Sequence, residues 1–210
     1  MTFFEAYDAL LAAGARPEHA ARVAEMRRAF EKRTGALSPG DGWSEGLEAR
    51  MRAFWDDALA TQGFAETMAQ APGELTEEAR AWTGAIGRAH RGLFVVAGED
   101  AGARILRDLW SGAELVVHAI DDATRLALAA ASAPFDARLV GTDDPPQIAM
   151  MPGALFHPAD ATAPITKVLE RARAANRTTG DVLDTLLRME RELRSSARVK
   201  AAYAYRLEKL

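Results

Sequence analysis

Apolar residues recur at helical spacing through the first 90 residues, where they form four stripes. The stripes are Phe3, Tyr7, Leu10 and Leu11, then Val23, Met26 and Phe30, then Leu47, Met51, Phe54 and Ala58, then Ala79, Trp82, Ile86 and Ala89. Glycine or proline separates them at Gly14, Gly35, Gly63 and Pro72. This period of three to four residues predicts amphipathic helices whose apolar faces form a core. We therefore expect residues 1–90 to form a helical block, arranged as a small bundle.

The period changes after residue 90 to one typical of β-strands. Leu93–Val96 is a compact β-prone run, and residues 105–120 are predicted to form a hairpin with Trp110-Ser-Gly at its tip. An alanine-rich stretch, 121–132, is expected to form one or two helical turns. Alternation resumes in Phe135–Val140, with Asp136 and Arg138 opposite the apolar positions, and Gln147–Met151 is the last predicted strand. About five short strands are near the lower limit for a small barrel or a curled antiparallel sheet.

Helical spacing returns beyond Pro158. One stripe contains Ile165, Val168, Leu169 and Ala172, and the next contains Val182, Leu186, Met189 and Leu193. The predicted fold is therefore α+β, with a helical block at 1–90, a small central antiparallel sheet or barrel at 91–158 and C-terminal helices at 159–210. The chain has neither an internal repeat nor a low-complexity linker, so we expect the three segments to pack as one unit.

Composition narrows the compartment and the chemistry. The 210 residues contain no cysteine, which excludes disulfides, thiol catalysis and cysteine-based metal sites. The first residues are acidic where an export signal is basic, and no run of 18 apolar residues occurs, so we expect a cytoplasmic protein without a membrane partner. Arginine outnumbers lysine by 22 to 4. We interpret this bias as the base composition of a GC-rich bacterial genome.

The charge is unevenly distributed. Residues 1–158 carry a net charge of −8 and residues 159–210 one of +4, giving −4 for the whole chain. Such a split fits either an anionic partner at the C-terminal segment or a basic segment docked on its own acidic body. We favour internal docking, because it requires no partner.

The sequence lacks the common motifs for catalysis and cofactor binding. The four histidines, His19, His90, His118 and His157, do not occur at metal-ligand spacing. The glycines match neither a phosphate-binding loop, nor a dinucleotide fingerprint, nor a nucleophile elbow. The sequence therefore predicts no catalytic residue, no metal and no cofactor, and favours a protein that is not an enzyme. We interpret His157, which lies between Phe156 and Pro158, as a structural loop histidine.

The C-terminal segment carries the best candidates for a contact surface. Basic residues there are interleaved with tyrosines, a combination that can neutralise phosphates and stack on bases. The candidate residues are Arg194, Arg198, Lys200, Tyr203, Tyr205 and Arg206. Glu190, Glu192 and Glu208 dilute this positive charge, and Glu190 is placed to pair with Arg194 one helical turn away. An ordinary solvated helix face is the simpler interpretation.

Three functions remain open. We favour a non-enzymatic binding or regulatory protein that acts through contacts with another protein, because the chain builds a core but shows no catalytic set. The first alternative is a nucleic-acid-binding protein that uses the basic C-terminal helices. The second alternative is an enzyme whose acid and base residues meet only in three dimensions. The sequence sets neither the partner nor the oligomeric state.

Overall fold

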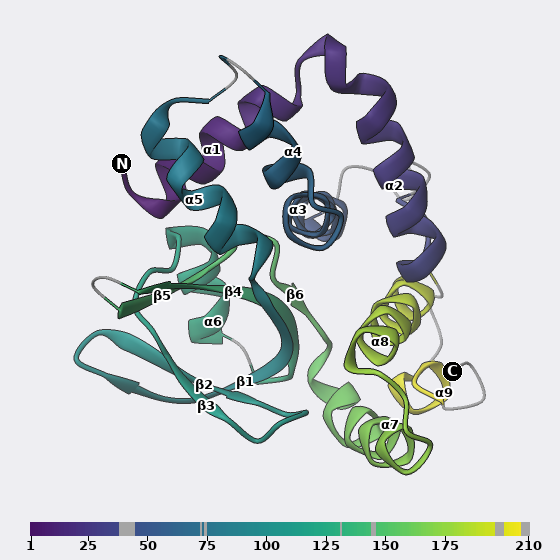
Figure 1. The fold of residues 1–210 in the computed structure, drawn as a ribbon. Coiled ribbons are helices and arrows are strands. Elements are labelled where there is room, and N and C mark those ends of the chain that lie inside the picture. The colour runs from purple at the N-terminus through teal and green to yellow at the C-terminus, as the bar shows by residue number, and fades with distance from the viewer. Residues whose placement is uncertain are drawn as a thin grey trace.

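A computed structural model describes residues 1–37, 45–71, 73, 75–130, 132–143, 146–195 and 200–206. It confirms the predicted α+β fold, which consists of N-terminal helices, a curled antiparallel half-barrel and C-terminal helices (Figure 1). Within the described ranges, every helix is too short or too polar to cross a membrane.

The N-terminal block contains more helical segments than the four stripes predicted. Its elements are α1 (Phe3–Gly14), η1 (Pro17–His19), α2 (Ala20–Thr34), α3 (Glu45–Asp56), η3 (Asp57–Thr61), α4 (Phe64–Gln70) and α5 (Glu77–Gly87). Local sequence fixes several of the boundaries. Thr2 and Glu5 form a reciprocal capping box at the start of α1, and Thr76 accepts a hydrogen bond from the Ala79 amide to cap α5. The third stripe continues from α3 into η3, a π-helical turn.

The central sheet is antiparallel throughout its named strands. These are β1 (His90–Asp100), β2 (Ala103–Asp108), β3 (Glu114–Val117), β4 (Phe135–Asp143), β5 (Pro146–Met150) and the short β6 (Leu155–Phe156). The order is β3-β2-β1-β4-β5, and β6 pairs with β4. The chain after β3 approaches β5, where the His118 amide donates to the Ile148 carbonyl at 2.8 Å. The predicted turn at residues 110–112 joins β2 to β3, and the alanine-rich stretch forms α6 (Asp122–Ala130).

The C-terminal helices pack against both other parts of the chain. They comprise η4 (Ala159–Ala161), α7 (Thr162–Ala174), α8 (Thr179–Arg194) and α9 (Ala201–Ala204). Figure 1 shows α8 beside α2, with α7 and α9 beyond the end of the sheet. Arg188 of α8 donates to the Arg33 carbonyl at the end of α2 at 2.7 Å. The basic face of α8 thus contacts the N-terminal block directly.

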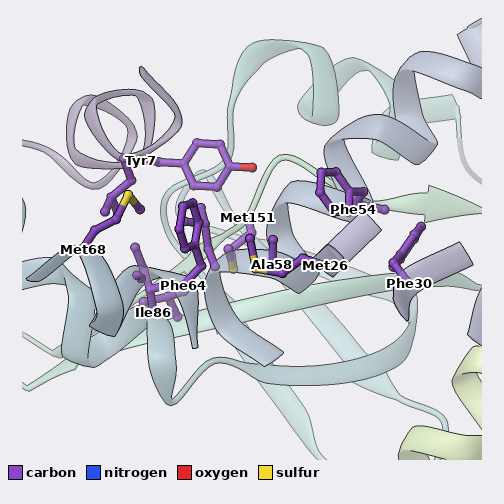
Figure 2. Close-up of a cluster of buried hydrophobic side chains, with 14 of the residues drawn as sticks. Tyr7, Met26, Phe30, Phe54, Ala58, Phe64, Met68, Ile86 and Met151 are labelled. Carbon is purple, nitrogen blue, oxygen red and sulfur yellow. The ribbon is translucent and has the colours of Figure 1, made fainter. Parts of the chain in front are cut away.

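Three clusters of buried side chains hold these parts together. The N-terminal cluster includes Phe30, Phe54 and Phe64 (Figure 2) and extends to Val140 and Met151 of the sheet region. A second cluster fills the interior of the half-barrel. The third lies under the C-terminal helices. Val140 of β4 packs in the N-terminal cluster and Leu93 of β1 packs in the C-terminal cluster, so helices cover the outer face of the sheet at these two strands.

Candidate functional site

A hollow of about 460 Å³ lies between η4, α7 and α9. Its floor is apolar and includes Val168 and Ala202, whereas three cations line it, Lys167, Arg171 and Arg206. Asp160 is the one acidic group among the described residues of the lining. We call this feature the cationic hollow. Apolar surface beside a few charged groups is the usual composition of a ligand site.

The helical period of α7 explains how its cations come to face the hollow. Lys167 and Arg171 are four residues apart and therefore lie on one side of the helix. The stripe that contains Ile165 and Leu169 faces the C-terminal core cluster instead. Arg206 approaches from the other wall, and its guanidinium lies 4.7 Å from the centre of the Tyr203 ring. Among the described residues, no carboxylate forms an ion pair with any of the three cations.

The structure brings some of the sequence-predicted residues together and separates others. Tyr205 and Arg206 line the cationic hollow, and Tyr203 stacks beside it with 59% of its surface exposed. Lys200 is exposed at the start of α9. Arg194 lies on α8, where it forms the predicted pair with Glu190 and donates to the Phe156 carbonyl. Arg198 falls outside the described residues.

Tyr205 anchors the α9 wall of the hollow to the body of the protein. Its hydroxyl lies 2.7 Å from Nδ1 of His157, and both side chains are buried. Burial lowers the pKa of His157 to about 4 and raises that of Tyr205, so both side chains are neutral near pH 7. The other ring nitrogen, Nε2, has no partner among the described residues. His157 is thus a buried histidine bonded to the Tyr205 hydroxyl.

Sequence inspection did not single out Lys167 and Arg171. Their spacing of four was visible, but it resembles the solvated face of any amphipathic helix. Only the packing of α9 against α7 turns that face into the wall of a hollow. The net charge of +4 for residues 159–210 pointed to the segment that contains these two cations, but not to α7 in particular.

A second polar feature, a series of linked and largely buried ion pairs, lies between the helices and the sheet. Asp57 accepts from Arg138 at 2.7 Å and from Arg33 at 2.5 Å. Arg33 also pairs with Asp184 at 2.8 Å. The series continues to the sheet, where Arg91 of β1 pairs with Asp184 at 2.6 Å and with Asp136 at 2.8 Å. Its two ends, Asp136 and Arg138, are two residues apart on β4. We call these six residues the ionic ring; they are Arg33, Asp57, Arg91, Asp136, Arg138 and Asp184.

The π-helical turn η3 helps to place the ionic ring. The Gln62 amide reaches back to the Asp57 carbonyl at 2.9 Å, and the turn presents Asp57 and Thr61 to the same guanidinium. Arg138 donates to Asp57 at 2.7 Å and to the Thr61 hydroxyl at 3.1 Å. Turns of this type often occur at functional sites. Here the turn aligns side chains that join the helices to β4.

Asp56 precedes this turn and is the acid with the largest resolved pKa change. Burial raises its pKa to about 7. Its two oxygens accept from the Tyr7 hydroxyl at 2.6 Å and from the Gly153 amide at 2.8 Å. A side chain at position 153 would lie 2.7 Å from the Ala53 backbone, so only glycine allows this approach. Perturbed acids are common in active sites, but Asp56 has no exposed surface and both of its oxygens have donors.

The described residues do not include a group of three or more histidine or acidic side chains placed to hold a metal ion. Comparisons with protein-family models, with curated proteins and with solved structures return no significant match. The functional argument therefore depends on the cationic hollow and its surroundings.

Proposed function

We propose that this protein is a non-enzymatic binding protein of the bacterial cytoplasm, and that an acidic segment of a partner protein occupies the cationic hollow. The observation that carries the proposal is the set of three cations, Lys167, Arg171 and Arg206, around an apolar floor without ion-pair partners among the described residues. Unpaired charge on a surface selects a partner of opposite charge and speeds its approach. An apolar floor selects an apolar side chain next to that charge.

The size of the hollow fits this kind of partner. A volume of about 460 Å³ accommodates one or two side chains of a partner segment. We expect the segment to place one or two carboxylates beside Lys167 and Arg171 and an apolar side chain over Val168. Asp56, whose pKa is strongly raised, is enclosed, and its oxygens accept hydrogen bonds from within the protein. This structural role favours binding over catalysis.

A nucleic acid is the second candidate, and one observation favours it. Tyr203 is 59% exposed and carries the Arg206 guanidinium on its ring, an arrangement that can stack on a base. One feature favours a protein partner instead. Tyr205 is only 4% exposed and its hydroxyl bonds His157, so it offers little ring surface on which a base could stack.

Fluorescence anisotropy tests the proposal directly. The probe is a labelled peptide in which glutamate alternates with leucine, compared with a peptide in which glutamine replaces glutamate and with a single-stranded DNA of equal charge. Each is titrated at low and at physiological salt. We expect the glutamate peptide alone to bind at physiological salt, because it alone offers carboxylates beside apolar side chains.

Two double variants locate the binding. Lys167→Glu with Arg171→Glu should abolish it. Arg28→Glu with Lys32→Glu is the matched control, since these exposed cations on α2 have the same spacing. Peptide binding that survives the α7 change would contradict the proposal. Tight DNA binding, with a log–log salt slope of about 0.7 per phosphate contacted, would replace it with the nucleic-acid function.

A further inference from the structure

Two adjoining hollows lie along the seam between α5 and the ends of β4 and β5, away from the cationic hollow. The smaller, of about 270 Å³, is lined by Ala81, Ala85, Arg88 and Gly141. The larger, of about 460 Å³, is lined by Phe4, Gln147 and Ala149. Both share Trp82 and Thr142, so Trp82 stands between them. We call this pair of hollows the Trp82 seam.

Trp82 is only half-buried, although its place in the apolar stripe of α5 predicted a core residue. Its ring packs edge-to-face on Phe3, with centroids 5.5 Å apart, and this contact fixes its orientation. The rest of the ring lines the two hollows. The indole N–H has no hydrogen-bond partner within the described part of the chain. A partly exposed indole usually presents both a flat apolar surface and a donor to a ligand.

A cation lies at the edge of the smaller hollow. Arg88 follows the last turn of α5, and its guanidinium folds back along that helix, where a Cβ atom at Gly84 would lie 3.5 Å from Nη1. No described carboxylate forms an ion pair with Arg88. Two glycines, Gly84 and Gly141, line this hollow and place no side chain in it. A Cβ atom at Gly141 would meet no atom within 4 Å.

We propose that the Trp82 seam binds a small aromatic carboxylate. An aromatic ring seated against Trp82 would bury apolar surface in hollows whose combined size suits a small molecule. A carboxylate on the same molecule matches Arg88 and makes a charge-assisted hydrogen bond to it. Neither a neutral ring nor an inorganic anion satisfies both features. This proposal is independent of the function assigned to the cationic hollow.

The test uses two probes that differ in charge but share a ring, 1-naphthaleneacetate and 1-naphthaleneacetamide. The chain has four tryptophans, so a ¹⁵N correlation spectrum contains four indole N–H signals. Trp82→Phe identifies the signal of Trp82. We expect the acetate to shift this signal in a saturable manner, and to bind roughly five-fold more tightly than the amide because of one partly exposed ion pair.

Three variants make the proposal falsifiable without loss of the fold. Arg88→Gln should equalise the affinities of the two probes. Gly141→Val should block both, because it fills open space in a strand where valine is favoured. Gly180→Ala, at an equally open glycine on α8, is the control and should bind as the wild type does.

Three results would overturn the proposal. The first is a Trp82 signal that does not move at millimolar 1-naphthaleneacetate, and the second is binding that Gly141→Val leaves unchanged. The third is 1-naphthaleneacetate binding that survives Arg88→Gln but disappears when Lys167 and Arg171 are changed to glutamate, since this would place the probe in the cationic hollow.

Discussion

The Tyr7 hydroxyl of α1 donates a 2.6 Å hydrogen bond to Oδ1 of Asp56, a carboxyl without exposed surface whose pKa is raised by burial to about 7. Above its ordinary value of 3.8, the unfolded chain has lost this proton while the folded chain retains it until about pH 7. The contribution of Asp56 to stability therefore falls as pH rises through this window, by roughly 4 kcal/mol in total.

Replacing Asp56 tests the predicted direction of this pH dependence of stability. Asp56→Asn removes the titration, so its deficit in unfolding free energy relative to the wild type should shrink as pH rises from about 4 to 7. Urea denaturation followed by circular dichroism at several pH values measures that deficit. A deficit that stays constant across the window would show that Asp56 is already ionised in the folded protein.

His157 should change stability with pH in the direction opposite to Asp56. Burial lowers its pKa to about 4, so below the ordinary value of 6.5 the unfolded chain takes up a proton that the folded chain does not. Stability is full above pH 6.5 and declines toward pH 4, by roughly 3 kcal/mol from this group. His157→Phe should lose the Tyr205 bond at every pH, and its stability should fall less than that of the wild type between pH 6.5 and 4. His118→Gln, at an exposed histidine, is the control; an unchanged acid profile in His157→Phe would contradict this assignment.

Removing one member of the ionic ring should strongly lower the free energy of unfolding. Arg138→Met deprives the buried Asp57 of one of its two cations and should lower the free energy of unfolding by about 3–5 kcal/mol. The matched control is Arg107→Met, whose side chain is 52% exposed and pairs with Glu114 on the surface. This change should cost less than about 1 kcal/mol. Equal losses in urea unfolding would show that burial of the ring contributes nothing.

The sheet should not fold without its helices. Residues 91–158, expressed alone, retain Arg91, Asp136 and Arg138 but lose their partners Asp57 and Asp184. They also expose outward-facing apolar residues of β1 and β4 that pack in the helical clusters. We expect narrow amide dispersion in a ¹⁵N correlation spectrum of this segment, against wide dispersion for the whole chain. Wide amide dispersion in the isolated segment would show that the sheet folds without the helices.

Periodicity predicted most of the elements, because the spacing of apolar residues in a helix or strand reflects which of its faces is buried. The α5 stripe, the turn at residues 110–112 and α6 all lie where the sequence placed them. Periodicity did not predict the ionic ring. Asp136 and Arg138 alternate with buried apolar residues and therefore look like a solvated face, as such alternation normally indicates. Helices cover that face, and the partners come from positions 33, 57 and 184, which no local pattern connects.

The candidate site was predictable to a similar extent. Tyr205 and Arg206 stand out because a tyrosine beside an arginine is chemically distinctive. Lys167 and Arg171 do not, because paired cations on a helix are ordinary. The helical spacing of Trp82 predicted a core residue. Spacing alone does not show that one side of its ring is left uncovered where α5 meets β4.

The ionic ring also provides a way to recognise distant relatives of this chain. Its six members come from five regions of the sequence, and each pairs with at least one other member, so we expect selection to act on them as a set. A homologue too diverged for overall similarity should still carry an Arg at the end of its second helix, an Asp opening its π-turn, an Arg at the first central strand, an Asp-x-Arg on the fourth and an Asp on the penultimate helix. That spaced pattern is a fingerprint of ancestry rather than of activity.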